Sequence, residues 1–299
     1  MRILIAGSSG FLGTRLRAGL VSKGHTTTSL VRRPPSGDGE VQWDPYAGAL
    51  DQQVVDAHDV VVNLAGSPLI GNPHSRKWAD SVMTSRVTTT RVLAEAVAAS
   101  ATKPAFLAGN GISFYGDHGS EPLTEQADSR GEALLTRVGR AWQDAAEPAR
   151  AAGARVCVLR TAPIYDRRSQ PLGALRLQFK AGLGGRLGDG TQYVPMISAR
   201  DWVDAVIHLA ESATAQGPFN LCCAKAPTNA ELTAELAHQL NRRAILPVPA
   251  FVLRRAAGQM SDELLGSVNC VPSALVNSGF QHQDPDVSAV LSEGLDPSR

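Results

Sequence analysis

The chain has 299 residues, of which 29 are Lys or Arg and 28 are Asp or Glu, so its formal net charge is +1. This balance argues against a charge-driven nucleic-acid binder, which normally carries a basic surplus or stripe. With 43% hydrophobic and 19% charged residues the chain can build a proper core, and its length fits one large α/β domain or two modest ones.

The sequence indicates a reduced, cytoplasmic setting. The apolar run at the N-terminus stops at Gly7, too early for a signal peptide, and no stretch approaches the roughly 18 apolar residues of a membrane span. The four cysteines lack CxxC spacing, so we interpret them as small buried residues: Cys157, Cys222, Cys223 and Cys270. We therefore expect a cytoplasmic protein without membrane association.

Strands and helices alternate along the first half of the chain. Apolar runs predict strands at 2–6, 59–64, 105–108 and 155–160, and a segment rich in β-branched residues predicts a strand at 26–31. Helical spacing of apolar residues predicts helices at 10–22, 75–99 and 130–152, the last interrupted at Pro148. Near-continuous apolar strands between helices are typical of a parallel sheet covered on both faces. The sequence thus predicts an α/β fold with a Rossmann-type, doubly wound parallel sheet.

The pattern changes after about residue 165. A polar loop is predicted at 167–171 and a glycine-rich loop at 182–190, which is either a ligand-closing segment or a surface hairpin. Further on we expect a helix at 201–212, a strand at 218–222, a helix at 229–241 capped by Thr228 or Asn229, and two proline-punctuated helices. We predict one domain over residues 1–165, completed by later segments, and a smaller C-terminal α/β lobe over 166–299.

A glycine motif, GSSGFLG, stands between the first predicted strand and the first predicted helix. Gly7 allows the tight turn, Gly10 lets backbone N–H groups approach a pyrophosphate, and Gly13 permits close packing of helix and strand. We predict dinucleotide binding here, the alternative being a glycine-rich turn without a ligand. The predicted contacts are Gly7, Ser9, Gly10, Phe11, Leu12 and Gly13.

The second predicted strand ends in two arginines, Arg32 and Arg33. A site that prefers NAD usually has Asp or Glu at this distance from the glycine loop, where it binds the ribose 2′-hydroxyl. A guanidinium instead matches a phosphate through paired, charge-assisted hydrogen bonds. The two arginines therefore predict NADP(H), bound through its 2′-phosphate, against the alternative of a solvated pair.

The segment Asn63-Leu64-Ala65-Gly66 follows another buried strand. Ligands of doubly wound sheets bind beyond the carboxyl ends of the strands, and small residues there let the chain pass close to a ribose. We predict that Leu64, Ala65 and Gly66 flank the adenosine ribose.

Together these motifs resemble the extended short-chain dehydrogenase/reductase superfamily, and more narrowly its atypical "epimerase family protein" branch, sometimes labelled cell-division-inhibitor-like. The resemblance covers nearly the whole chain. It also rests on Trp78, 85–90 (SRVTTT), 115–117 (YGD), 123–125 (LTE), Trp142, 159–161 (LRT), the 182–190 loop, Asp201, 217–220 (GPFN), 247–249 (PVP) and 279–280 (GF). The family implies a Rossmann-type NADP-binding domain and a small substrate lobe. On this basis Gly109, Asn110, Gly111 and Pro163 are expected to line the nicotinamide side, with Arg86 as a further cofactor contact or a structural salt bridge.

The usual catalytic pair of this superfamily is a tyrosine followed four residues later by a lysine on one helix face. Four residues after Tyr46, Tyr115, Tyr165 and Tyr193 stand Leu50, Gly119, Ser169 and Ile197. Tyr115 is the one side chain that we predict as a proton donor, with aromatic packing as its alternative role. Asn110 and Ser113 are hydrogen-bonding residues without an obvious base. The seven histidines form no HxxxH or HExxH pattern, so we expect no metal site.

The sequence leaves three functions open. The favoured hypothesis is an NADP(H)-binding oxidoreductase, or an epimerase-like hydride-transfer enzyme, acting on a small oxygenated substrate. The alternative is a non-catalytic NADP(H)-binding protein that senses redox state, and the third is a nucleotide-sugar epimerase. We expect a small-molecule partner and no nucleic acid, with a homodimer as one assembly open to the chain.

Overall fold

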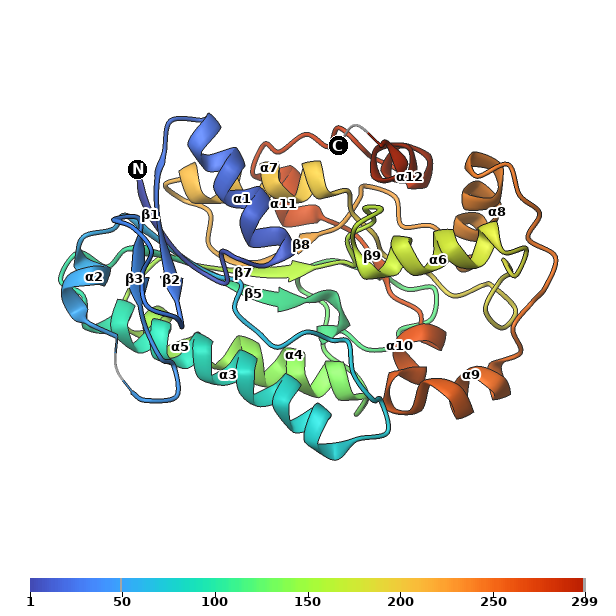
Figure 1. Cartoon of the computed structure of the whole chain (residues 1–299), viewed down its shortest axis with the longest axis horizontal. Helices are drawn as coiled ribbons and strands as arrows, with labels where there is room; N and C mark the ends of the chain where they lie inside the picture. Colours follow the sequence, from blue (N-terminus) through green and yellow to red (C-terminus); the bar gives the residue numbers. More distant parts are fainter. Residues whose placement is uncertain (49, 298–299) are drawn as a thin grey trace. The chain divides into compact units, whose positions relative to one another are not determined.

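The computed structural model describes residues 1–48 and 50–297, so Ala49 and the last two residues of the predicted C-terminal lobe lie outside it. Its main sheet has seven strands in the order β3-β2-β1-β4-β5-β7-β8 (Figure 1). These strands are β1 (Arg2–Ala6), β2 (Thr26–Val31), β3 (Glu40–Gln42), β4 (Val60–Asn63), β5 (Ala105–Gly111), β7 (Val156–Thr161) and β8 (Gly217–Leu221). The pairings β1–β2, β1–β4, β2–β3 and β4–β5 are parallel, which confirms the predicted fold class.

The described residues form two compact units. The first comprises residues 1–110, 138–159 and 203–218, and the second comprises 111–137, 160–202 and 219–297. The helices are α1 (Phe11–Ser22), α2 (Gln52–Asp56), α3 (Arg76–Ala99), α4 (Leu134–Asp144), α5 (Glu147–Ala151), α6 (Gln170–Lys180), α7 (Ala199–Glu211), α8 (Asn229–Gln239), α9 (Ala250–Ala257), α10 (Ser261–Leu265), α11 (Ser273–Asn277) and α12 (Val287–Leu295). Two short 3₁₀ helices, η1 (Ile112–Phe114) and η2 (Gly258–Met260), complete these elements.

The core of the first unit lies between its sheet and its helices. α1 and the later part of α7 lie on one face of the sheet, and α3 and α5 lie on the other (Figure 1). Leu4, Val61 and Phe106 on neighbouring strands pack with Leu93 and Val97 of α3, and all five are fully buried. Apolar residues on both faces of a strand are needed only where helices cover both faces, as the sequence pattern predicted.

The second unit has its own core and a small sheet. Leu172 and Phe179 of α6 pack with Leu232 and Leu236 of α8 and with Leu291 of α12. β6 (Pro122–Leu123) pairs in parallel with β9 (Asn269–Cys270), which joins segments almost 150 residues apart.

Several predicted boundaries were wrong. The helix expected at 130–152 begins at Leu134 and divides before Glu147, because Pro148 is accommodated only in the first turn of a new helix, α5. The predicted loop at 167–171 ends early, since α6 begins at Gln170 with Pro171 in its first turn. The two helices expected at the end are four among the described residues: α9, α10, α11 and α12.

The predicted cap of α8 was confirmed. Thr228, rather than Asn229, caps α8, and it forms a capping box with Glu231. Ser75 caps α3 by accepting a hydrogen bond from the backbone N–H of Trp78. Within the described ranges, none of the helices has both the length and the apolar character that crossing a membrane requires.

Candidate functional site

The glycine motif forms a tight turn between β1 and α1. Gly7 has a φ of +82°, a conformation that side chains disfavour. A Cβ on Gly7 would lie 2.6 Å from the carbonyl carbon of Leu64, and a Cβ on Gly13 would lie 2.2 Å from the carbonyl oxygen of Gly7. Glycine is therefore required at both positions for the turn, the helix and the segment after β4 to approach one another.

The N-terminus of α1 carries no capping side chain within the described part of the chain. Gly10 stands at the N-cap, and the first turn holds no acidic residue. The first backbone N–H groups of a helix need partners, and together with the helix dipole they favour an anion. The first turn begins with Phe11, whose ring is covered by the guanidinium of Arg15 at 3.9 Å. This end of α1 is thus suited to a pyrophosphate.

A buried hydrogen-bond network shapes the turn after β4. The amide nitrogen of Asn63 donates to Thr90 Oγ1 at 2.8 Å, and Asn63 Oδ1 accepts from the backbone N–H of Ala65 at 3.0 Å. Trp142 Nε1 donates to the same Thr90 Oγ1 at 2.8 Å. Asn63, Thr90 and Trp142 belong to separate sequence motifs, and the structure shows that they act together to hold the turn.

The two arginines after β2 differ in their surroundings. The guanidinium of Arg33 donates to both carboxylate oxygens of Glu40, at 2.7 and 2.6 Å. The hydrogen bonds from Arg33 and Ser36 hold the pKa of Glu40 at about 2. In the described residues the side chain of Arg32 has neither an ion pair nor a hydrogen bond, so it is the more available of the two for a phosphate. No sequence pattern indicated this difference, because Glu40 stands on a short strand, β3, that was not predicted.

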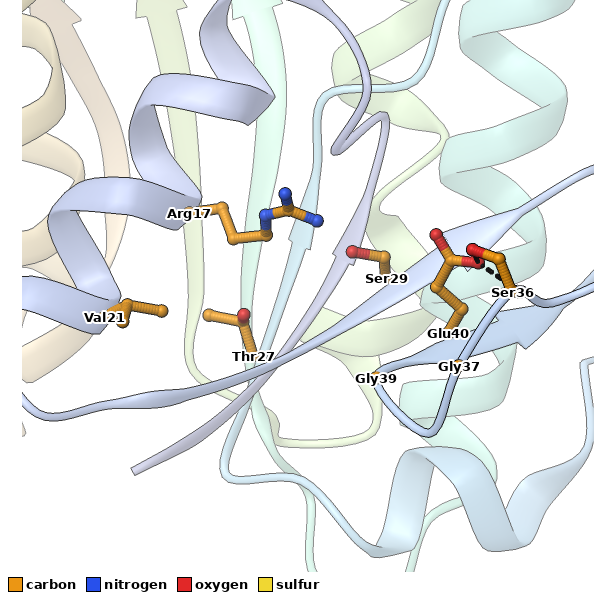
Figure 2. A pocket seen from close by; sticks show the side chains of 8 residues that line it. All are labelled: Arg17, Val21, Thr27, Ser29, Ser36, Gly37, Gly39 and Glu40. Carbon is orange, nitrogen blue, oxygen red and sulfur yellow. Dashed lines mark hydrogen bonds between the residues drawn. The ribbon is translucent and has the colours of Figure 1, made fainter.

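A polar pocket lies beside this arginine pair. Figure 2 shows the side chains of Arg17 from α1 and Glu40 from β3 on either side of Ser29. Its volume is about 290 Å³, at the low end for a small-molecule site. Its lining holds none of the predicted cofactor residues: it is formed by Arg17, Val21, Thr27, Ser29, Ser36, Gly37, Gly39 and Glu40. We therefore do not assign the cofactor to it.

Arg86 of α3 lies next to the turn after β4. Its Nη1 donates to the carbonyl oxygens of Ser67 at 3.1 Å and Val82 at 3.2 Å, and a Cβ on Gly66 would lie 3.2 Å from its Cγ. Burial lowers its pKa to about 10. No carboxylate pairs with it within residues 1–48 and 50–297, so the salt-bridge alternative is wrong. A guanidinium with donors to spare is suited to an anionic or hydroxylated ligand.

The residues predicted on the nicotinamide side fall in both units. A Cβ on Gly109 would lie 2.7 Å from the carbonyl oxygen of Asn63, and the amide of Asn110 donates to the carbonyl oxygen of Gly139. Both belong to the first unit, whereas Gly111 and Pro163 belong to the second. Gly109 and Asn110 thus have packing roles, and cofactor contact by these four residues stays a prediction.

Tyr115 is fully buried in the second unit, with an exposed fraction of 0%. Its Oη lies 2.7 Å from Asn220 Oδ1 and 3.1 Å from the carbonyl oxygen of Thr124, and it accepts a hydrogen bond from Arg160 Nη1 at 2.8 Å. Burial raises the pKa of Tyr115, while the Arg160 charge lowers it. These contacts fit the alternative of a packing residue better than that of a proton donor.

The same network gathers other motif residues. Glu125 accepts hydrogen bonds from the backbone N–H groups of Asn220 at 3.1 Å and Ala274 at 3.0 Å. The guanidinium carbon of Arg160 lies 3.8 Å from the centroid of the Phe114 ring. The motifs at 123–125, 159–161 and 217–220 therefore have a common structural role.

The glycine-rich loop at 182–190 packs against the segment around Val248. The backbone N–H of Val248 donates to the carbonyl of Arg186, and that of Gly188 donates to the carbonyl of Val248, both at 2.9 Å. A Cβ on Gly185 would lie 1.7 Å from the carbonyl oxygen of Leu246. The loop is bound on one side and is not a free surface hairpin.

The described ranges contain no cluster of three or more His, Cys, Asp or Glu side chains that could hold a metal ion. All four cysteines are buried and unpaired by disulfides.

Comparisons with known proteins agree with this geometry. The model of the "NAD dependent epimerase/dehydratase family" matches residues 3–222, and that of a domain of unknown function, DUF1731, matches residues 248–293. An epimerase family protein of Mycobacterium leprae is 34% identical over 291 residues, covering 97% of this chain and 94% of that protein.

Two solved structures are also similar. Human epimerase family protein SDR39U1, crystallised with NADPH, is 28% identical with a TM-score of 0.86, covering 98% of this chain and 99% of that chain. A nucleoside-diphosphate sugar epimerase from Corynebacterium glutamicum is 31% identical with a TM-score of 0.82, covering 99% of this chain and 58% of that chain. The predicted resemblance is thereby confirmed, whereas the cell-division-inhibitor label has no support among these names.

Proposed function

The chain belongs to the NAD dependent epimerase/dehydratase family, and from this premise we propose that it binds NADP(H) and transfers hydride to or from a small oxygenated substrate. The observation that carries the proposal is the turn between β1 and α1. Its glycines leave no room for side chains, and α1 begins there without a capping side chain among the described residues. The solved human relative that contains NADPH supports the choice of cofactor.

We assign the cofactor contacts residue by residue. Gly7, Ser9, Gly10, Phe11, Leu12 and Gly13 present backbone N–H groups to the pyrophosphate. Arg32 binds the 2′-phosphate. Arg33 contributes a second contact to the phosphate when its ion pair with Glu40 is broken. Leu64, Ala65 and Gly66 flank the adenosine ribose. The guanidinium of Arg86 provides a further hydrogen-bond donor to the cofactor. Gly109, Asn110, Gly111 and Pro163 stay assigned to the nicotinamide side. When bound, the cofactor supplies or accepts the hydride.

Titration of the protein with NADPH and NADH tests this proposal. We expect tighter binding of NADPH, and we expect Arg32→Ala to weaken NADPH binding about 10- to 100-fold, as a lost charge-assisted contact of roughly 1.5–3 kcal/mol implies. NADH binding should change little. The matched control is Arg254→Ala, because Arg254 is an exposed arginine of α9. Equal affinities for the two cofactors in the wild type would contradict the choice of NADP(H).

The absence of a YxxxK pair and the burial of Tyr115 favour a second candidate function, NADP(H) sensing without turnover. Oxidation of NADPH in the presence of a panel of carbonyl compounds separates the two candidates. Turnover supports the enzyme, whereas cofactor binding without turnover, with affinities that differ strongly between NADP⁺ and NADPH, supports the sensor.

The similarity to the Corynebacterium epimerase keeps nucleotide-sugar epimerisation as a third candidate, and incubation with UDP-sugars tests it. We retain a cytoplasmic location and a small-molecule partner as part of the proposal. A homodimer is the assembly to test first, by light scattering.

A further inference from the structure

We propose that Ser113 and Glu263 form the pair that exchanges a proton with the substrate oxygen. This inference rests on the hydride transfer proposed above and supplies the acid–base group that the missing tyrosine–lysine pair leaves absent. Both residues belong to the second unit. The ligand that this pair would meet is a compound with a carbonyl or hydroxyl group.

The two side chains form a short hydrogen bond. Ser113 Oγ lies 2.7 Å from Glu263 Oε2, although the residues are 150 positions apart in sequence. Ser113 lies on η1, two residues after the last residue of β5, and it is half-buried. Substrates of open α/β sheets bind beyond the carboxyl ends of the strands, so a residue here is well placed to meet one.

The carboxyl group of Glu263 has an unused, buried oxygen. Glu263 Oε1 is buried without a hydrogen-bond partner among the described residues. An unpaired buried oxygen of this kind is unfavourable unless the acid is protonated or a ligand donates a hydrogen bond to it. Burial raises the pKa of Glu263, and the charge of Asp262 acts in the same direction, while Ser113 and the backbone N–H of Leu135 oppose it. A carboxyl that holds its proton at higher pH than usual is a suitable acid.

The segment that carries Glu263 is fastened to the loop that carries Ser113. The backbone N–H of His118 donates to the carbonyl of Ser267 at 3.0 Å, and the backbone N–H of Ser267 donates to Asp117 Oδ1 at 3.2 Å. Ser267 Oγ also bonds the carbonyl of Gly119, and Asn269 bonds that of Ser120. Together with the β6–β9 pairing, these contacts fix α10 beside η1. The pair is therefore pre-organised rather than a chance meeting of two mobile side chains.

The proton balance of a reduction follows from the geometry. With Glu263 protonated on Oε2, the acid donates across the 2.7 Å contact to Ser113 Oγ, and the hydroxyl hydrogen of Ser113 is free to face the substrate. As the carbonyl carbon of the substrate gains hydride from NADPH and the C=O π bond breaks, its oxygen takes the proton of Ser113. Ser113 recovers a proton from Glu263, which is left as a carboxylate and is reprotonated from water. Oxidation of an alcohol by NADP⁺ runs through the same two residues in reverse.

Two variants and a neighbouring control test the pair. Glu263→Gln keeps the shape of the side chain but cannot give up a proton, and Ser113→Ala removes the hydroxyl. We expect each to lower kcat for NADPH-dependent carbonyl reduction at least about 100-fold, with Kd for NADPH within about twofold of wild type. Asp262→Asn, an exposed change on the same helix, should keep turnover near the wild-type rate. The wild-type kcat/KM should fall as Glu263 loses its proton, and this fall should be absent in Glu263→Gln.

Infrared spectroscopy of the Glu263 carboxyl group, which requires no turnover, tests the proposal independently. The infrared difference spectrum of wild type minus Glu263→Gln should show a protonated carboxyl that persists above the ordinary glutamate pKa of about 4.3. An ordinary titration, or unchanged kcat in both variants, would overturn the proposal. Failure of the wild type to bind NADPH would instead overturn the proposed function, and it is distinguishable because it appears before any substitution is made.

Discussion

Tyr115 and Asn220 are 105 residues apart in sequence, and their side chains meet with 2.7 Å between Tyr115 Oη and Asn220 Oδ1. The amide nitrogen of Asn220 continues the network by donating to the carbonyl of Val271 at 2.9 Å. Tyr115 thus ties the loop after β5 to β8 and to the C-terminal segment. Its hydroxyl is a cross-link inside the second unit, which explains why a tyrosine stands there without a lysine four residues later.

Removal of this hydroxyl should destabilise the protein without weakening cofactor binding. Tyr115→Phe removes the donor to Asn220 Oδ1 and one acceptor of Arg160 Nη1 in a buried site, so we expect the free energy of unfolding to fall by roughly 1–3 kcal/mol. Urea denaturation measures the loss, and Tyr46→Phe, a change at an exposed tyrosine, is the control. Unchanged stability combined with loss of turnover would return Tyr115 to the role of proton donor.

The turn before α1 should be intolerant of side chains for steric reasons. Gly7 and Gly24 have φ values of +82° and +80°, yet a Cβ on Gly24 meets no atom within 4 Å, whereas one on Gly7 meets the backbone at Leu64. Gly24→Ala should cost about 1–2 kcal/mol from its backbone conformation alone. Gly7→Ala should cost more and weaken NADPH binding at least about tenfold, because the segment after β4 must move. Equal losses of stability in thermal melts, with equal NADPH affinities, would refute the close-packing argument.

The elements that depend on residues close together in sequence were predicted correctly. β1 and β2 were predicted at their observed bounds. β1 is a short apolar run that ends at a glycine, and β2 is rich in β-branched residues, which favour strands. The glycine turn was predicted from the local spacing of its glycines, since Gly13 packs against the carbonyl oxygen of Gly7 six residues earlier. The close approach of Gly7 to Leu64 joins distant segments, and the spacing of the glycines does not predict it.

Contacts between distant segments left no such signal. Ser113 was recognised as a hydrogen-bonding residue without an obvious base, and its partner Glu263 stands in a region where the number of helices was mispredicted. Likewise β6 and β9 have two residues each, too few to create an alternating pattern, and they exist only because they pair with each other. The sequence likewise could not separate Arg32 from Arg33, because Glu40 engages only the second.

Glu40 should weaken the preference for NADPH. Its carboxylate is ionised across the physiological range, since its pKa is held at about 2, and it competes with a 2′-phosphate for Arg33. Glu40→Gln should therefore raise the ratio of NADPH to NADH affinity by about 3- to 10-fold, an effect that added salt should reduce. Glu95→Gln, a change at an exposed carboxylate of α3, is the matched control. An unchanged ratio in Glu40→Gln would show that Arg33 takes no part in reading the phosphate.

The buried carboxyl of Glu263 should also make stability depend on pH. Because burial raises its pKa, the folded protein binds a proton that the unfolded chain releases, in the window above the ordinary glutamate pKa of about 4.3. Within that window the free energy of unfolding of the wild type should fall as pH rises, since the folded state must ionise a buried acid. Glu263→Gln has no proton to lose, so its stability should exceed that of the wild type at pH 8 by more than it does at pH 4. Urea denaturation at a series of pH values measures this difference, with Glu95→Gln, a change at an exposed carboxylate of α3, as the control that should follow the wild-type curve. Parallel curves for wild type and Glu263→Gln would mean that Glu263 titrates alike in the folded and unfolded chain, and its assignment as a buried acid would then be wrong.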